Sequence, residues 1–200
     1  KAVMFSLYFA IPVMLLFVHA STHLIESFYV HGKFKAAYVL PTAQTLAALV
    51  LGLPAYVLIK IFSTTFFAHG LTKPPVVVAM LGVVFNIVIT LVLIDRYHQV
   101  GMAIASAVSA WVSAMLLWVL LWRRKLYGLS PQLKRFLVQV IIINIGFAVL
   151  LSIAYQTLWV NVTAFFGYAW LSTSVVLGGI MLAFIYGGSR FGLYKLKKAP

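Results

Sequence analysis

Long apolar runs separated by short polar segments dominate this sequence. Six runs are about as long as the roughly 20 residues that a helix needs to cross a bilayer, and they cover residues 2–28, 38–67, 76–94, 100–122, 136–158 and 164–186. Because backbone polar groups in hydrocarbon must bond within their own segment, such runs form helices. The pattern predicts an all-α, polytopic membrane protein of six transmembrane helices, four in residues 1–125 and two additional ones in 126–200.

The first run begins directly after Lys1, and the sequence does not open with Met. This run is longer than the 7–15 apolar residues of a typical signal peptide and shows no clean small-residue cleavage site. We therefore interpret it as a span, and we expect the chain to start inside a longer protein.

The second run is long for a single straight crossing. A helix over residues 38–67 would measure roughly 45 Å at 1.5 Å per residue, whereas the hydrocarbon core is about 30 Å thick. Pro54 lies near the middle of the run, where it removes one backbone donor and clashes with the preceding turn. We predict a kink at Pro54. Broken helices near the midplane are common in transporters, but a merely structural kink is an equal alternative.

Composition agrees with a membrane chain. Hydrophobic residues make up 64% of the sequence and charged residues 8%, against about 45–50% and about 25% in soluble domains. The net charge of +13 would suggest nucleic acid in a soluble protein. Here the basic residues lie between the apolar runs, without a stripe of interleaved aromatics, so we expect no nucleic-acid partner. The absence of cysteine excludes disulfides and thiolate metal sites.

The distribution of basic residues predicts an orientation. If the N-terminus is cytoplasmic, eleven Lys and Arg residues lie at cytoplasmic ends and three lie at outer ends, with one more inside a span. The two acidic residues, Glu26 and Asp95, also fall on the outer side. Because cytoplasmic loops are enriched in Lys and Arg, we predict a multi-pass protein of the inner (cytoplasmic) membrane with both termini in the cytoplasm.

Polar side chains inside the runs are candidates for chemistry. His19, His23 and Glu26 share one helical face, and two histidines four residues apart can bind a metal. No further ligand is evident and the group is near the outer end, so we favour interfacial polar capping and expect no metal.

Neutral oxygens form a second candidate site. Asn86 and Thr90 share a face of the third span, and Ser106 could approach from the fourth. These oxygens could coordinate a monovalent cation, although helix–helix hydrogen bonding is the commoner use. The fourth span also carries rows of small residues that allow close helix packing. The sequence contains neither a hydrolase elbow nor a P-loop, so we expect no enzyme, no cofactor and no ATP coupling within this chain.

Several motifs between residues 28 and 125 occur in an order and spacing typical of a known family. They are Phe28-Tyr29-Val30-His31-Gly32-Lys33-Phe34, Leu51-Gly52-Leu53-Pro54-Ala55, Val57-Leu58-Ile59-Lys60-Ile61, Phe66-Phe67-Ala68 and Thr72-Lys73-Pro74-Pro75. Asn86 in the third span and Gly101-Met102-Ala103 at the start of the fourth continue the pattern. On these residues the chain resembles the MviN/MurJ family of lipid II flippases, whereas residues 131–200 match only as two further helices.

The resemblance implies a fold of fourteen helices in two lobes around a central cavity, within the MOP exporter superfamily. This chain looks like helices nine to fourteen, the C-terminal portion. It departs from the family at His69-Gly70-Leu71, where an acidic or basic residue is usual. The family's most functionally important arginines lie in the first eight helices, so no complete site can be transferred to this chain.

Lys60 is the unambiguous charge inside a predicted span. A lysine at mid-bilayer costs at least about 2.5–3.5 kcal/mol on insertion scales, so it normally faces a cavity or snorkels to the headgroups. The resemblance favours the first interpretation, in which Lys60 is a substrate-binding point charge for the pyrophosphate of a lipid-linked precursor. Snorkelling is the alternative.

Together these features predict part of an alternating-access flippase for the lipid-linked peptidoglycan precursor lipid II, used in cell-wall synthesis. Its expected partners are that precursor, membrane lipids and the N-terminal lobe of the same transporter. Within transport, the alternatives are a related polysaccharide-lipid flippase or a multidrug exporter. Outside transport, the alternative is a non-transporting membrane scaffold or remnant.

Overall fold

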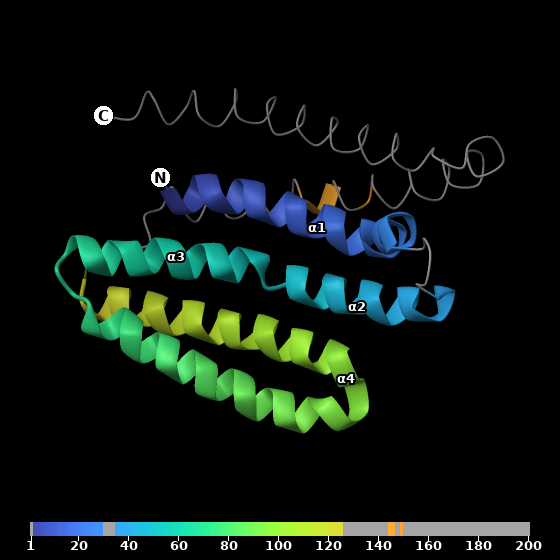
Figure 1. Cartoon of the computed structure of the whole chain (residues 1–200). Coiled ribbons are helices and arrows are strands. Elements are labelled where there is room, and N and C mark those ends of the chain that lie inside the picture. The colour runs from blue at the N-terminus through green and yellow to red at the C-terminus, as the bar shows by residue number, and fades with distance from the viewer. Residues whose placement is uncertain (1, 30–34, 126–143, 147–148, 150–200) are drawn as a thin grey trace. The chain divides into compact units, whose positions relative to one another are not determined.

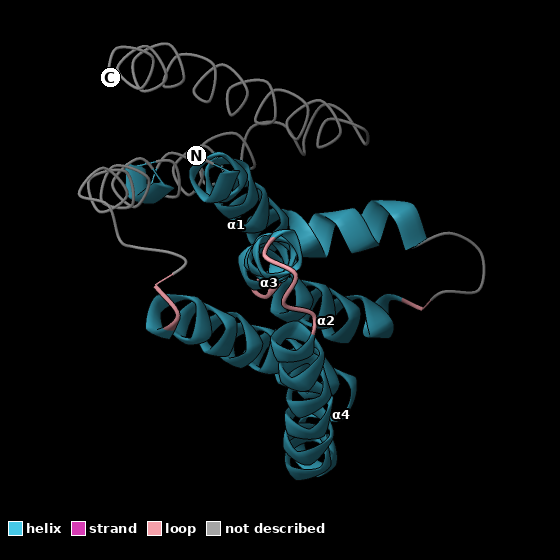
Figure 2. Ribbon diagram, turned by 90° about the vertical axis from the view of Figure 1, so that its left-hand side faces the viewer, coloured by secondary structure: helices cyan, strands magenta, loops and turns pink. Residues whose placement is uncertain are grey.

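The computed structural model describes residues 2–29, 35–125, 144–146 and 149. Its elements are α1 (Ala2–Tyr29), a 3₁₀ turn η1 (Ala36–Tyr38), α2 (Val39–Val50), α3 (Leu53–Ala68) and α4 (Lys73–Arg123). All of them belong to one compact unit, Lys1–Gln139. The described residues contain no strand, as Figure 2 shows. Of the predicted fifth span only 144–146 and 149 are described, and they are helical; the sixth span lies outside the described residues.

Helix α1 agrees with the first predicted span to within one residue at its C-terminal end. Pro12 lies inside this helix. It lacks the N–H that would bond to the carbonyl four residues earlier. Figure 1 shows α1 running alongside the pair α2 and α3, and α1 packs against both of them.

The second predicted span is a broken helix, but its break is not centred on Pro54. Helix α2 ends at Val50, residues Leu51 and Gly52 form a turn, and α3 begins at Leu53. Pro54 is therefore in the first turn of α3. Backbone N–H groups in that turn have no acceptor within the helix, so the proline costs no hydrogen bond there. The expectation of a kink is confirmed, and its position is corrected to the turn just before the proline.

Helix α4 is a hairpin of two antiparallel limbs, 73–97 and 99–123, and Figure 1 shows the fold-back between them. The backbone leaves helical geometry at His98, with φ 47° and ψ −126°. The limbs correspond to the third and fourth predicted spans, with two differences. The first limb begins at Lys73 rather than 76, because Pro74 and Pro75 fit a first helical turn. The turn at His98 lies within residues 95–99, which the predicted spans leave between them, and the first limb stays helical past Asp95 up to this turn.

The core lies between α3, the two limbs of α4 and the N-terminal half of α1. Phe66, Leu117 and Leu121 are fully buried, and they belong to a cluster with Val3, Leu7, Phe62 and Val78. A second cluster joins Ala55 of α3 to Ala110 and Ala114 of α4. Small residues at these positions let the helix backbones approach closely, so the predicted packing role of the fourth span is confirmed.

Two helical stretches, Val39–Ala68 and Lys73–Arg123, are long and apolar enough to cross a membrane. Since the second stretch folds back at His98, each limb measures about 37 Å at 1.5 Å per residue. That length exceeds the roughly 30 Å of hydrocarbon. The described part of the chain is therefore an all-helical assembly with the dimensions of a membrane protein.

Candidate functional site

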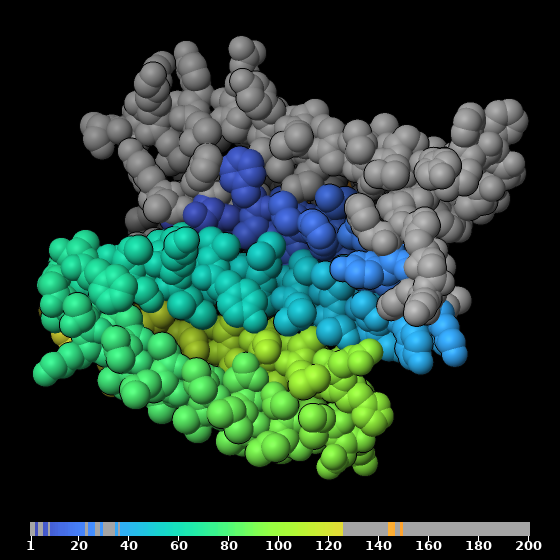
Figure 3. Space-filling view, in the orientation of Figure 1, coloured from blue at the N-terminus to red at the C-terminus, as the bar shows by residue number. Residues whose placement is uncertain are grey.

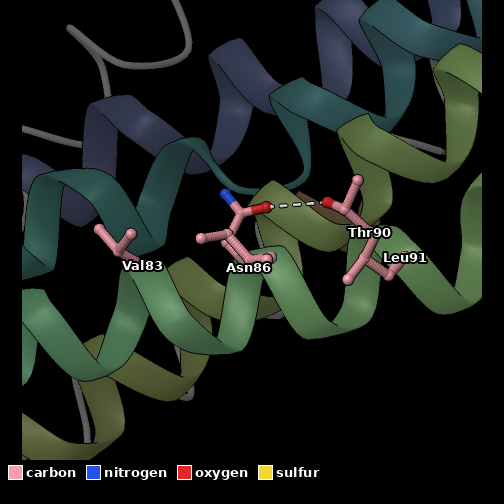
Figure 4. Close-up of a pocket in the computed structure, with 5 residues that line it drawn as sticks. Val83, Asn86, Thr90 and Leu91 are labelled. Carbon is pink, nitrogen blue, oxygen red and sulfur yellow. Dashed lines mark hydrogen bonds between the residues drawn. The ribbon is translucent and has the colours of Figure 1, made fainter.

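The hairpin brings the three predicted oxygen-bearing residues together. The Asn86 amide Nδ2 donates a hydrogen bond to Ser106 Oγ across the limbs at 3.3 Å. Thr90 Oγ1 donates to Asn86 Oδ1 within the first limb at 3.1 Å. Figure 4 shows Asn86 and Thr90 pointing toward each other. The arrangement contains the helix–helix hydrogen bond considered above, and whether the same oxygens also hold an ion stays a prediction.

A surface hollow of about 300 Å³ lies beside this chain of hydrogen bonds. Its lining is apolar except for the amide and the hydroxyl, and consists of Val83, Asn86, Ile87, Thr90 and Leu91. Asn86 Oδ1 has two lone pairs and uses one of them for Thr90. The hollow thus presents a neutral oxygen donor set within an otherwise apolar helix.

The broken helix exposes polar side chains next to apolar ones. Its four threonines, Thr42, Thr45, Thr64 and Thr65, all donate to backbone carbonyls three or four residues earlier. Lys60 and Gln44 are exposed, and neither makes a hydrogen bond or ion pair with any residue that the structure describes. Lys60 therefore has its predicted place within α3, on the side opposite buried Phe62.

In Figure 3 the cyan residues of α2 and α3 lie at the surface between blue α1 and the green limb of α4. The exposed side chains of that green limb include a long apolar row: Val76, Val77, Met80, Val83, Val84, Ile87, Val88, Leu91 and Val92. A lysine in a span normally faces a cavity or snorkels to the headgroups, whereas this row of the α4 limb carries only apolar side chains.

The break between α2 and α3 is held by a contact that the sequence did not reveal. Trp111 Nε1 on α4 donates to the Leu51 carbonyl at 3.1 Å. A Cβ placed on Gly52 would lie 3.1 Å from the Ala107 Cα, so the two backbones nearly touch there. An interrupted helix frees backbone carbonyls that must find other donors in a membrane, and the indole N–H is such a donor.

Of the group His19, His23 and Glu26, the structure describes two side chains. His19 Nδ1–H donates to the Leu15 carbonyl at 3.0 Å, and both His19 and Glu26 are exposed. The His23 side chain lies outside what the structure describes. Among the residues it does describe, no three His, Asp or Glu side chains converge as a metal would require.

A comparison with family models gives one match that covers most of the chain. The model described as "Lipid II flippase MurJ" matches residues 1–184. The chain belongs to the MurJ family. The resemblance inferred from the motifs is thereby confirmed, and the match extends well beyond residues 28–125 into the segment that sequence inspection matched only as helices.

Comparison with individual proteins gives the same family. The chain is 30% identical over 168 residues, 83% of its length, to the "Probable lipid II flippase MurJ" of Haemophilus influenzae. It is 33% identical over 100 residues, half of its length, to that of Rickettsia prowazekii. It is 31% identical over 112 residues, 56% of its length, to the "Lipid II flippase MurJ" of Thermosipho africanus.

These matches cover 32%, 19% and 24% of the respective MurJ relatives. The chain thus spans about a fifth to a third of their length. A flippase is a transport protein rather than an enzyme, so membership of the MurJ family agrees with the expectation that this chain is part of a transporter and not of an enzyme. The membrane assignment is also supported, by the family and by the apolar helices.

Proposed function

We propose that this chain is part of a flippase that moves the lipid-linked peptidoglycan precursor lipid II across the cytoplasmic membrane. The observation that carries the proposal is the family match over residues 1–184. We assign the chain to the C-terminal portion of the transporter, and its partner is the N-terminal lobe of the same protein. The two lobes would rock about a shared cavity while the lipid tail stays in the bilayer.

Within this proposal Lys60 binds the pyrophosphate of the substrate. The exposure of Lys60, and of Gln44 and Tyr56 in the same broken helix, supports a cavity over lipid, since each polar group left in hydrocarbon costs several kcal/mol. No acidic residue occurs between Glu26 and Asp95. A negatively charged headgroup is therefore a fitting counterion for this amine.

Asn86, Thr90 and Ser106 form the proposed monovalent-cation site. In the intact transporter, Asn86→Ala should lower thermal stability only slightly, since interhelical hydrogen bonds in membranes average about 0.6 kcal/mol. It should, however, abolish any dependence of transport on the concentration of Na⁺ or K⁺, because it removes the amide oxygen, one of the three proposed ligands, together with the amide group that bonds to both Thr90 and Ser106. Transport measured against each cation checks this. If the cation dependence of transport is unchanged in Asn86→Ala, the cation site is refuted, and the three residues serve only in helix packing.

We further propose six spans with both termini in the cytoplasm. In an intact protein depleted of native cysteines, single cysteines at Lys33 and Gln156 should react with an impermeant maleimide added from outside. A cysteine at Lys125 should react only after the membrane is opened. The expected difference follows from the eleven-to-three distribution of basic residues. If a cysteine at position 125 is labelled from outside, the proposed orientation is wrong and the opposite one holds.

The proposal also predicts that this segment does not transport by itself. Alternating access requires two bodies that move about one site, and the chain covers about a third or less of the three relatives described above. Reconstituted alone, it should translocate labelled lipid II no faster than protein-free vesicles, whereas the intact protein should translocate it. Failure of the intact protein would refute the flippase assignment; activity of the segment alone would refute the two-lobe mechanism.

A further inference from the structure

Tyr56 is an aromatic residue of α3 that the transport proposal leaves without a role. It lies within a membrane-length helical stretch, yet 42% of its surface is exposed. Its hydroxyl makes no hydrogen bond to any residue that the structure describes. A phenol normally finds a partner for its O–H when water is absent, so this group needs either water or a ligand.

The position of Tyr56 is fixed next to Lys60. The two residues are four apart on α3, which places their Cβ atoms about 5–6 Å from each other on one helical face. The ring is also held at its inner edge, because a Cβ on Gly52 would lie only 2.9 Å from Tyr56 Cε2. The absence of a side chain at position 52 lets the ring settle against the turn between α2 and α3.

The chemistry of the substrate places a sugar close to Lys60. In a glycosylated lipid diphosphate, the first sugar is bonded directly to the phosphate. A diphosphate held by Lys60 therefore has its first sugar within a few ångströms of one flank of that lysine. On the Tyr56 flank the aromatic side chain is 42% exposed and its hydroxyl has no partner among the described residues. On the other flank the Thr64 hydroxyl already donates to the Ile61 carbonyl at 2.8 Å.

We propose that Tyr56 supports the first sugar of the lipid-linked substrate, with its ring against the apolar face of the pyranose. Tyr56 is thus the residue that distinguishes a glycosylated lipid diphosphate from the bare lipid diphosphate. The inference rests on the proposed function, and it assigns to Lys60 and Tyr56 separable tasks. Lys60 recognises the charge, which both lipids carry, and Tyr56 recognises the sugar, which one of them lacks.

Equilibrium binding of two lipids to the intact transporter tests this assignment. The probes are lipid II and undecaprenyl diphosphate, and the variants are Tyr56→Leu, Tyr56→Phe and Lys60→Ala. Tyr56→Leu should weaken lipid II binding about threefold to tenfold, the range expected for one aromatic contact, and leave undecaprenyl diphosphate binding unchanged. Tyr56→Phe keeps the ring and should retain most of the affinity for lipid II. Lys60→Ala should weaken the binding of both lipids.

Met80→Ala is the matched control, because Met80 is 67% exposed on the apolar face of α4 and should alter neither affinity. If Tyr56→Leu weakens both lipids equally, or neither, the sugar contact is refuted. A photoreactive benzoylphenylalanine at position 56 gives an independent measurement that works even if the variant binds lipid II more weakly. It should crosslink to the disaccharide of lipid II. Crosslinks to the polyprenyl chain alone would overturn the proposal. Failure of the unmodified protein to bind lipid II would instead refute the proposed function.

Discussion

Gly101→Ala is expected to destabilise the intact protein by about 1–3 kcal/mol, the usual cost of overpacking a filled site. A Cβ at position 101 would lie 2.7 Å from the Leu93 carbonyl oxygen and 3.0 Å from the Leu93 carbonyl carbon. Both atoms are backbone, so the clash is relieved only by moving one limb of the hairpin. Alanine otherwise favours a helix over glycine by about 0.5–1 kcal/mol, and any loss of stability therefore comes from this contact. Thermal unfolding of the purified protein measures it.

Gly82→Ala is the matched control on the other limb of the same hairpin. There the added Cβ would meet only the Ser113 side chain, with Oγ at 2.5 Å, and a hydroxyl can move to another staggered rotamer. We expect a small change, which Ser113→Ala should remove in the double variant. Equal losses of stability in Gly101→Ala and Gly82→Ala would show that backbone contact does not decide how closely the limbs approach.

Lys60→Ala is expected to lower the affinity of the intact transporter for lipid II about tenfold to a hundredfold. Hydrogen bonds to charged groups contribute about 1.5–3 kcal/mol, and the substitution removes the ammonium that is proposed to meet the pyrophosphate. Lys60→Arg should retain the charge and part of the activity, although a planar guanidinium does not reproduce a point charge. Growth of a flippase-depleted strain, together with the amount of protein in the membrane, reports the effect in cells.

The snorkelling alternative predicts the opposite result for the same variant. If the amine only reaches toward headgroups, Lys60→Ala places a cheaper residue in the span, and transport continues at a normal protein level. Lys73→Ala is a suitable control, because Lys73 is exposed at the start of α4, outside the broken helix. Full growth support by Lys60→Ala at normal protein level would exclude the binding role.

Much of the local structure could be predicted from the sequence because its causes are local. Apolar runs of membrane length specify helices wherever water is absent, which accounts for α1, for the broken pair α2 and α3, and for the two limbs of α4. Proline acts on its own turn of backbone, so a break near Pro54 followed from the sequence. The exact position of the break, at Leu51 and Gly52, could not be predicted, because a proline is also compatible with the first turn of a new helix.

The tertiary structure decided which polar groups meet and which remain open. The sequence placed Asn86 and Ser106 in neighbouring spans, but only the fold-back at His98 sets the register in which they bond. The Trp111 contact with the Leu51 carbonyl, and the exposure of Tyr56 beside Lys60, depend on which face of α3 the other helices cover. The apolar periodicity of a helix surrounded by lipid and protein alike is weak, since both neighbours are apolar. Packing geometry, rather than the hydrophobic pattern, therefore decides which face of each helix is covered by its neighbours and which stays exposed.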